Sequence, residues 1–462
     1  MKKRTIFCGM SISTLVILLL FACSKKDSTD SSTSVVITAL TCSGATFSTT
    51  AVNGTVYSGT ATVPYTGGNG ATYSAGSAIS STGVTGLTAT LQAGTLASGA
   101  GSLTYTIAGT PTSYGTAAFA ISLGGQSCSL SLTVDSAAVT ADCSSAANTP
   151  AKVVCLAEAF EATLSSSQLS TLLPGYSQTT AIKWSNLPCG SSCRNGLQFT
   201  NLTSAQITAA LAVVAAASGT VTDEGYSEIT QIMAADDVLK TASGGSSYSS
   251  GIYFIAFLGT PSTTGTWQLQ FGGHHLAVNI TYKAGAVVGA TPRFEGIEPK
   301  SWTTSGTTYA PLASEQSTMA AMLASLSTTE LASAKLSTTF SDVLLGPNED
   351  GQFPSTKVGL AVSSLTSAQQ LLVLAAMKPW VQDVDDATAA TLLATYQSEL
   401  SSTYIAYSGN ATLASNADYV RIDGPSVWIE FVCQTGVVYP SQIHYHSIWR
   451  DHTRDYGNSF TF

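Results

Sequence analysis

All five histidines of the 462-residue chain lie in two short segments. His274 and His275 follow two glycines in Gly-Gly-His-His, and His444, His446 and His452 lie close together near the C-terminus. Imidazole is the commonest metal ligand in proteins and the side chain that titrates nearest neutral pH. Histidines that served as scattered core or surface residues would not be collected in this way. The clustering predicts one site built from two segments that are distant in the sequence.

The spacing of the second segment favours a shared ligand face. His444 and His446 are two residues apart, and such residues of a β-strand point to the same side of the sheet. Adjacent residues point to opposite sides, so only one of His274 and His275 needs to point at the shared site. The two glycines before them suggest a bulge or a sharp approach in the strand, and a bulge could direct both rings to the site. We predict a site for zinc or copper with these four histidines as ligands. His452 lies beyond the strand and is a weaker candidate.

The main alternative is a hydrogen-bonded network of structural histidines that holds no metal. In the metal interpretation the imidazoles need acceptors that fix their orientation, and we assign Asp451, Asp455 and Gln270 to this role. The two aspartates lie beside the second histidine segment, in Arg-Asp-His-Thr-Arg-Asp. They fit equally well as turn residues that pair with Arg450 and Arg454.

Glu430, Glu298 and Arg450 are the candidate catalytic residues. Glu430 lies in the apolar segment Val-Trp-Ile-Glu-Phe, and a carboxylate in such a strand is rarely buried without a partner. Arg421 in the preceding strand is the expected partner, and we favour a structural salt bridge over a general-base or metal-ligand role. The sequence has no motif of zinc proteases, serine hydrolases, phosphate-binding loops or dinucleotide-binding folds. Whether the protein is an enzyme stays open.

Two classes of function fit these residues. As an enzyme, the protein would use metal-activated water for hydrolysis, or copper redox chemistry, on an extracellular substrate. Trp267, Trp428 and Trp449 near the histidine segments could line a cleft for a glycan or a peptide, although such tryptophans are more often core residues. The alternative is a non-catalytic surface module that captures metal or glycan, or whose histidines are structural.

Residues 1–22 have the composition of an export signal. Three basic residues precede an apolar stretch that is too short to span a membrane stably. The following Leu-Phe-Ala-Cys resembles the processing site of bacterial lipoproteins, which predicts cleavage before Cys23 and attachment of lipid to it. Ser24 after this cysteine resembles the pattern sent to the outer membrane. We therefore predict a protein anchored through Cys23 in the cell envelope, on the outer membrane or cell surface; an ordinary secretory signal is the alternative.

The chain is acidic but poor in charged residues. The formal net charge is −9, and removing three basic residues with the signal makes it −12. We expect an acidic surface, which argues against nucleic acid and anionic lipid as partners. The lipid on Cys23 is then the predicted link to the membrane. Charged residues make up 10% of the chain and apolar residues 44%, which is typical of a folded core rather than disorder.

Seven cysteines remain once those in the export signal and its processing site are set aside. Export permits their oxidation, although sequence alone does not fix the pairing. The expected pairs are Cys42–Cys128, Cys143–Cys155 and Cys189–Cys193, with Cys433 left as a buried thiol. A metal clip is the alternative for Cys189 and Cys193, but no second pair of this spacing completes four ligands.

The sequence predicts two domains, residues 35–136 and residues 151–462, which differ in the spacing of their apolar and polar residues. The first has short runs of alternating apolar and polar residues between glycine-rich turns, which predicts an all-β sandwich. Its turns resemble those of immunoglobulin-like modules of bacterial surface proteins, so we expect a spacer. Residues 23–34 form a polar tether and residues 137–150 a linker. The second domain alternates blocks of helices and strands, which predicts an α+β domain with helical blocks packed on a mainly antiparallel sheet.

Four segments of the second domain share a helix-start pattern. Each has Ser or Thr followed three residues later by Gln or Glu, with leucine just before, which is a capping box; the boxes begin at Ser165, Thr203, Ser327 and Thr366. We expect a helix after each of them. An internal repeat, residues 155–240 followed by 314–400, would explain the recurrence. We favour the simpler interpretation, in which one capping solution is used four times.

Several stretches of the second domain together resemble an uncharacterised bacterial family, the domain of unknown function numbered 3500. They are Trp184-Ser-Asn-Leu-Pro188 with Arg194-Asn-Gly-Leu197, Phe271-Gly-Gly-His-His275, Thr291-Pro-x-Phe-x-Gly296, Arg421-Ile-x-Gly-Pro425, and His444-x-His-Ser-x-x-Arg-Asp451 with Asp455-Tyr-Gly457. The resemblance covers about residues 150–460. It implies no particular reaction, but it implies that the histidine segments belong to the family's pattern.

Overall fold

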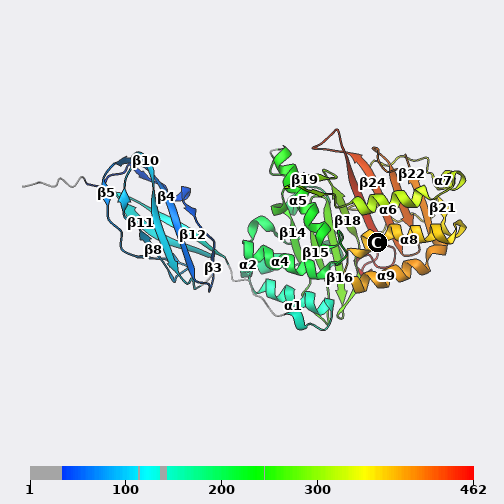
Figure 1. The fold of residues 1–462 in the computed structure, drawn as a ribbon. Helices are drawn as coiled ribbons and strands as arrows, with labels where there is room; N and C mark the ends of the chain where they lie inside the picture. Colours follow the sequence, from blue (N-terminus) through cyan, green and yellow to red (C-terminus); the bar gives the residue numbers. More distant parts are fainter. Residues whose placement is uncertain (1–33, 113–114, 136–142, 244) are drawn as a thin grey trace, which may run out of the picture.

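The computed structural model describes residues 34–112, 115–135, 143–243 and 245–462 (Figure 1). The predicted signal peptide, Cys23 with its predicted lipid, most of the predicted tether and residues 137–142 of the predicted linker lie outside these described residues. A strand-rich N-terminal part is followed by a larger part in which helices accompany an antiparallel sheet. Each part has a hydrophobic core of its own. Within the described ranges, no helix combines the length and the apolar character needed to cross a membrane.

The N-terminal part places two main sheets around one core. One sheet has the order β1-β4-β10-β8-β6 with β2 beside β4, the other has the order β3-β12-β11-β7, and β5 pairs with β9. Alternate residues of the strands point inward, as Ala117, Phe119 and Ile121 of β11 do. The strands are β1 (Ala39–Leu40), β2 (Thr46–Phe47), β3 (Ala51–Val52), β4 (Tyr57–Asn69), β5 (Thr72–Tyr73), β6 (Ile79–Ser80), β7 (Thr82–Gly83), β8 (Leu87–Leu91), β9 (Gly94–Thr95), β10 (Ser98–Gly109), β11 (Gly115–Leu123) and β12 (Gln126–Asp135).

The predicted disulfide pairing is confirmed. Bonds join Cys42 to Cys128, Cys143 to Cys155, and Cys189 to Cys193, so the last pair closes a short loop and is not a metal clip. Cys433 is a buried free thiol, as expected.

One large antiparallel sheet organises the C-terminal part. Its order is β13-β14-β15-β16-β18-β25-β24-β23-β22-β21, with β17 beside β16, while β19 and β20 form a separate hairpin. The strands are β13 (Leu197–Gln198), β14 (Phe254–Leu258), β15 (Thr266–Gly273), β16 (Leu276–Lys283), β17 (Ala286–Gly289), β18 (Arg293–Ile297), β19 (Trp302–Thr304), β20 (Thr307–Tyr309), β21 (Leu360–Ala361), β22 (Tyr404–Ser408), β23 (Tyr419–Asp423), β24 (Val427–Thr435) and β25 (Ile443–Asp451).

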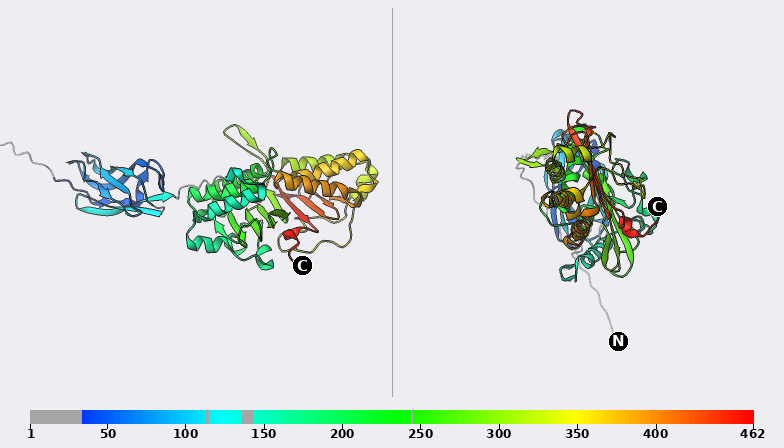
Figure 2. Two further views of the ribbon diagram at one scale, coloured as in Figure 1. Left: turned by 90° about the horizontal axis from the view of Figure 1, so that it is seen from below. Right: turned by 90° about the vertical axis from the view of Figure 1, so that its right-hand side faces the viewer.

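Helices cover one face of this sheet, as the turned views show (Figure 2). Their apolar side chains pack on alternate strand residues such as Phe257 and Trp449. Irregular segments and the four-residue helix at Gln178–Ala181 (α3) cover the other face, where Ala181, Trp184 and Tyr456 share a smaller core with Phe294. The helices are α1 (Thr149–Glu161), α2 (Ser166–Leu172), α3 (Gln178–Ala181), α4 (Ser204–Ala217), α5 (Tyr226–Ser243), α6 (Ala313–Ala324), α7 (Thr328–Ala334), α8 (Ser367–Gln382) and α9 (Asp386–Ser398).

The C-terminal part consists of two similar halves. All four predicted capping boxes are present, and they start α2, α4, α7 and α8. In each half a two-residue strand precedes α4 or α8 and pairs with the strand after the helices, β13 with β14 and β21 with β22. The two halves meet at β18 and β25 in the middle of the sheet. The internal repeat is therefore the better explanation, and our preferred interpretation of four unrelated caps is wrong.

Equivalent glycines support this repeat. Gly196 and Gly359 precede β13 and β21, and both have a positive φ, 87° and 99°. A β-carbon at Gly196 would lie 2.0 Å from the carbonyl oxygen of Ile255, and one at Gly359 would lie 2.3 Å from that of Ile405. The same close approach of two backbones, which only glycine permits, thus occurs once in each half.

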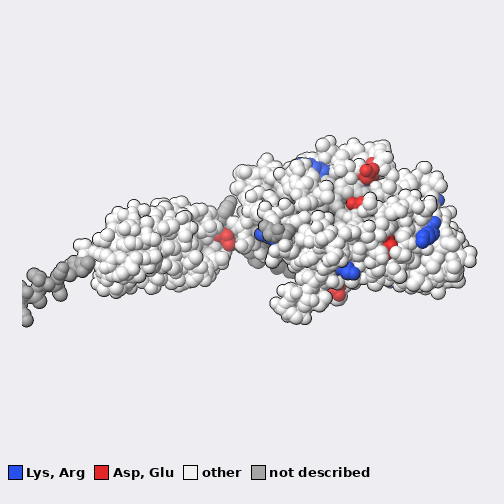
Figure 3. Space-filling model, turned by 90° about the horizontal axis from the view of Figure 1, so that it is seen from above, with Lys and Arg blue, Asp and Glu red and all other residues white. Residues whose placement is uncertain are grey.

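Much of the acidic character of the chain is internal. Twelve of the 24 acidic residues in the described ranges are buried, against four of the 13 basic ones. The remaining groups, 12 acidic and nine basic, are nearly balanced, and Figure 3 shows charged residues scattered over a mostly uncharged face. The surface is thus much less acidic than the net charge predicts. The buried acidic residues are Glu224, Glu228, Asp236, Glu295, Glu298, Glu315, Asp383, Asp385, Asp418, Asp423, Glu430 and Asp451.

Candidate metal centre

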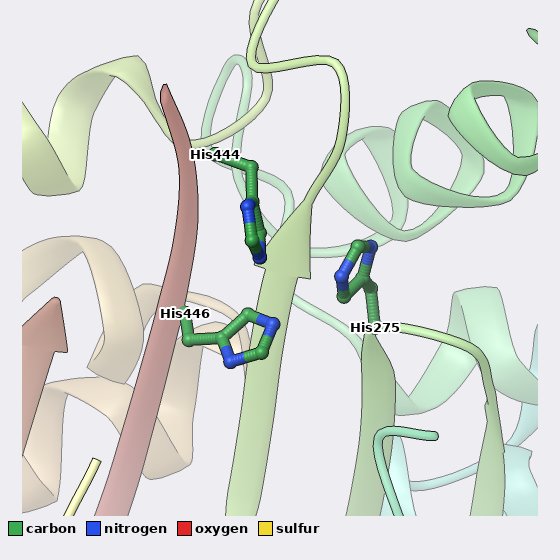
Figure 4. Close-up of side chains that lie close together, drawn as sticks. All are labelled: His275, His444 and His446. Carbon is green, nitrogen blue, oxygen red and sulfur yellow. The ribbon is translucent and has the colours of Figure 1, made fainter. Parts of the chain in front are cut away.

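Three of the four predicted ligands meet on the face of the sheet away from the helices. His444 and His446 project from β25, and His275 approaches them from the β15–β16 turn (Figure 4). Tyr445 and Trp449, on the opposite side of β25, belong to the helix-side core. One ring nitrogen of each histidine lies within 4.8 Å of the other two. The structure therefore contains a buried grouping that could bind a metal ion after small side-chain adjustments.

The two adjacent histidines form the tip of a tight turn. Strands β15 and β16 pair as far as Gly273 and Leu276, so His274 and His275 are the two connecting residues. His275 has a positive φ of 62°, which is uncommon for a residue other than glycine. The predicted bulge within a strand is wrong, because a two-residue hairpin turn supplies the change of direction. This turn brings the centroids of the two rings to 3.7 Å from each other.

Gly296 lets the histidines meet across a strand. β18 lies between β16 and β25, and Gly296 is directly opposite His446. Neighbouring strands are only about 4.8 Å apart, so a side chain at this position would stand between the rings of His275 and His446. A β-carbon there would lie 3.0 Å from the Cδ2 atoms of both rings. The absence of a side chain at Gly296 is thus part of the site.

Replacing Gly296 by alanine should weaken zinc binding on the order of tenfold, because the added methyl group moves two ligands apart by a few tenths of an ångström. Competition with a fluorescent zinc chelator measures this change. Gly175→Ala is the matched control, since a β-carbon at Gly175 meets no atom within 4 Å. Equal zinc affinities for the two variants would contradict the role given to Gly296.

Burial keeps the imidazoles of His275 and His444 neutral. His275 and His444 are only 4% and 2% exposed. Loss of solvation, reinforced by the neighbouring imidazoles, holds the pKa of His275 well below its usual value and lowers the pKa of His444 to about 3. Neutral imidazole is the form that binds metal. The Nδ1 atom of His444 is buried without a hydrogen-bond partner in the described structure, a need that a bound cation would meet.

Residues from remote segments orient two of the histidines. Asp342 Oδ1 lies 2.9 Å from Nδ1 of His446, and Gln434 Nε2 lies 3.1 Å from the same nitrogen. Asp236 of α5 lies 2.7 Å from Nδ1 of His274. These contacts leave the Nε2 atoms for a ligand. Burial alone would raise the pKa of Asp342, but the hydrogen bond and the charge of His446, together with hydrogen bonds from Val343 and Gln434, outweigh burial and lower that pKa. The sequence does not reveal these three partners, because no local pattern links them to the histidines.

A family model described as "Protein of unknown function (DUF3500)" matches residues 146–458. The chain belongs to this family. No curated protein and no solved structure matches the chain. The matched residues include both halves of the helix-and-sheet part and all the histidines, and we call this part the DUF3500 domain. The resemblance stated from the sequence motifs is thereby confirmed.

Two histidines of the DUF3500 domain stay outside the three-nitrogen set. His274 pairs with Asp236, and these two residues form a second possible grouping with His275. Because His275 belongs to both groupings, a single ion uses one of them. The three-histidine set is the better one, since it offers three imidazole nitrogens, whereas Nδ1 of His274 and Oδ1 of Asp236 are already paired with each other. His452 lies elsewhere, with Nε2 3.3 Å from Asp423.

Glu430 of the DUF3500 domain is held by neutral donors and not by Arg421. The two residues are directly opposite each other in β23 and β24, but no ion pair joins them in the described structure. Glu430 instead accepts hydrogen bonds of 2.5–2.9 Å from the main-chain N–H groups of Leu344 and Leu345, the Trp428 indole and the Tyr419 hydroxyl. The predicted salt bridge is therefore wrong. The carboxylate anchors the segment that follows Asp342, so it helps to place the partner of His446.

Arg450, Asp451 and Asp455 form a buried framework behind the C-terminal turn. Arg450 lies 3.0 Å from Asp455, and Asp451 lies 3.1 Å from Arg454. These pairs match the turn interpretation of the two aspartates. No hydrogen bond or ion pair in the described structure joins the three residues to the four predicted metal ligands, so the structure does not place them as partners of the imidazoles.

Glu298 and Gln270 also serve the framework of the DUF3500 domain. Glu298 Oε1 accepts hydrogen bonds of 2.8 Å from the main-chain N–H groups of residues 438–439. Gln270 bridges Asn195 and Asn279 at 2.8 and 3.0 Å. Neither residue contacts a predicted metal ligand through a described hydrogen bond. The three tryptophans considered for a substrate cleft are fully buried and belong to the interior: Trp267, Trp428 and Trp449.

Proposed function

We propose that the protein is an envelope lipoprotein whose DUF3500 domain binds zinc through His275, His444 and His446. The convergence of three buried ring nitrogens within 4.8 Å, from segments some 170 residues apart in the sequence, carries this proposal. The neutral imidazoles of His275 and His444 and the unpartnered Nδ1 of His444 support it. The carboxylate of Asp342 beside His446 is the kind of partner that fixes a histidine ligand.

We further propose that the site is catalytic and hydrolytic. Three protein ligands leave one position of a tetrahedral zinc site open, which is the pattern of catalytic zinc. Zinc held in this way would lower the pKa of a bound water toward neutrality and make it a nucleophile. Asp342 offers a route to solvent, because its side chain is 50% exposed while it contacts buried His446. An extracellular glycan or peptide is the substrate class we propose.

Metal capture without catalysis is the second candidate. The burial of the three histidines, each at most 7% exposed, favours it, because little of a large substrate reaches such a site. In this case the bound ion would have no exchangeable ligand.

Cobalt substitution separates the two candidates. Co²⁺ in place of zinc reports its coordination through visible absorption, and an open position takes up azide or a small thiol. We expect the absorption to change on addition of azide, together with hydrolysis of peptide or glycoside substrates that His444→Ala abolishes. Unchanged absorption and no hydrolysis would contradict the catalytic proposal and favour capture.

The N-terminal part is proposed as an immunoglobulin-like spacer between the lipid anchor and the DUF3500 domain. Two sheets around one core, closed by the Cys42–Cys128 bond, support this assignment. We expect the full-length protein, expressed with its leader, to partition into detergent, and Cys23→Ala to release it into the aqueous phase. Retention of the variant in detergent would overturn the lipid anchor.

A further inference from the structure

Five carboxylates meet on the helix side of the sheet, behind the histidine cluster. Gly296 of β18 faces the histidines, and its neighbour Glu295 faces the helices. Around Glu295 lie Glu228 in the first turns of α5, Glu224 just before α5, Glu315 in the first turn of α6, and Asp383 at the end of α8. Each of the five is at most 6% exposed. We call them the interior acid cluster.

Donors satisfy only part of the interior acid cluster. The Ser314 hydroxyl donates to Glu224 at 2.6 Å, and the main-chain N–H of Gly225 donates to Asp383 at 2.6 Å. Glu228 differs from both, because its two carboxylate oxygens are buried and have no hydrogen-bond partner in the described structure. One oxygen of Glu315, Oε1, is likewise buried without a hydrogen-bond partner there. A buried carboxylate without any donor is costly, so Glu228 points to a ligand that the protein atoms do not supply.

The positive charge at the interior acid cluster is too small for five carboxylates. Arg293 is the basic residue there; its Nε contacts Glu295 and lies 3.3 Å from Asp383. Among the five carboxylates, Glu295 and Asp383 are the two that Arg293 contacts in the described structure. Burial, with a further contribution from neighbouring carboxylates, raises the pKa values of Glu228 and Glu315 well above their usual range. The cluster therefore attracts either protons or a cation.

We propose that the interior acid cluster binds a divalent cation of the oxygen-preferring class, with Glu228 as its central ligand. Two sets of three carboxylates have their oxygens within 4.8 Å of one another, one with Glu224 and Asp383 and the other with Glu295 and Glu315, and Glu228 belongs to both. Carboxylate oxygens at this spacing suit Ca²⁺, which takes six to eight oxygens at about 2.3–2.6 Å, so that opposite ligands lie about 4.8 Å apart. Mg²⁺ and Mn²⁺ share this preference for oxygen.

The position of the cluster gives the cation a structural role. Glu224, Glu228 and Glu295 belong to the first half of the domain, whereas Glu315 and Asp383 belong to the second. The halves already touch here, where the N–H of Gly219 donates to the Asp383 carbonyl at 3.0 Å. A cation held by both sets of carboxylates would therefore fasten the two halves together. It acts independently of the histidine site, which uses nitrogen ligands on the other face of β18.

The test measures cation binding and thermal unfolding of the chain from Ser24 to Phe462. All six tryptophans lie in the DUF3500 domain, so their fluorescence reports unfolding of this domain within the intact chain. The His444→Ala/His446→Ala background removes the nitrogen site, and EDTA followed by dialysis removes bound ions. Ca²⁺, Mg²⁺ and Mn²⁺ are then added separately. Glu228→Gln and Glu315→Gln test the cluster, and Glu158→Gln makes the same chemical change at an exposed position of α1.

We expect Ca²⁺ or one of the other two ions to bind at one or two ions per chain and to raise the unfolding temperature by at least about 3 °C. Glu228→Gln should lose this shift, and without added ions it should unfold no earlier than the parent, because it removes an unpartnered buried charge. Glu315→Gln should weaken the shift, and Glu158→Gln should keep it. Absence of binding by all three ions, or parent-like binding by Glu228→Gln, would overturn the proposal and leave a proton-sharing cluster.

Discussion

Replacing His275 by alanine is expected to reduce zinc affinity at least about 100-fold and to abolish stoichiometric binding at micromolar metal. A structural zinc site with four protein ligands is worth roughly 10–16 kcal/mol, so one ligand accounts for about 3 kcal/mol. His275 is the only member of the three-nitrogen set from its segment. Isothermal titration with zinc, on chain purified without a histidine tag, measures the change.

The chain provides its own control for this experiment. His452→Ala removes the same side chain at a position that contacts Asp423 and lies outside the three-nitrogen set. Its zinc affinity should equal that of the parent. Comparable losses in the two variants would mean that zinc binds histidines non-specifically, and an unaffected His275→Ala would remove this residue from the site.

Replacing Arg450 by methionine is expected to destabilise the DUF3500 domain by about 3–5 kcal/mol, the usual cost of removing one partner from a buried ion pair. The guanidinium is fully buried, donates to the carbonyl oxygens of Leu345 and Gly346, and lies 3.0 Å from both Asp350 and Asp455. Its loss leaves two carboxylates without their cation. Urea unfolding followed by tryptophan fluorescence gives the change in the free energy of unfolding.

Arg454→Met is the matched control for this second prediction. Its side chain is 33% exposed and pairs with Asp451, and such partly exposed pairs contribute only about 0–1 kcal/mol. If the two variants lost similar stability, Arg450 would not have the framework role that the structure gives it. A stable Arg450→Met variant without hydrolytic activity would instead return this residue to the candidate catalytic group.

The geometry of the histidine site is only partly predictable from the sequence. The two-residue spacing of His444 and His446 is sufficient to place both rings on one face, because strand geometry has a period of two. The position of His275 beside the other two rings depends on a hairpin turn and on Gly296, which lies 21 residues further along the chain. The sequence shows a glycine at position 296, but it does not show that this residue lies between His275 and His446. That depends on the order of the strands in the sheet, where β18 lies between β16 and β25.

Partners of buried charges were the least predictable feature. Arg421 and Glu430 are opposite each other in the sheet as the sequence suggests, yet the carboxylate finds four neutral donors, two of them on a loop some 85 residues earlier. The interior acid cluster has no local signature at all. Its members are scattered between residues 224 and 383 and converge only because the two halves of the domain fold against each other.

The internal repeat is more predictable from the sequence than the partners of buried charges, but less so than the shared face of His444 and His446. The four capping boxes correctly predict the starts of four helices, because each box supplies local hydrogen-bond partners to main-chain N–H groups. They do not reveal that two pairs of helices are equivalent. That equivalence becomes visible only in the symmetric strand order and in the matching close approaches at Gly196 and Gly359.

The central claim, a zinc site made by three histidines, is tested most directly by the metal content of the purified protein. The chain from Ser24 onward, produced without a histidine tag, is compared with its His444→Ala/His446→Ala variant by inductively coupled plasma mass spectrometry after reconstitution with zinc and dialysis. We predict close to one zinc per chain in the parent and almost none in the variant. No zinc in the parent, with a variant that differs only in stability, would contradict the claim and identify the cluster as a structural network.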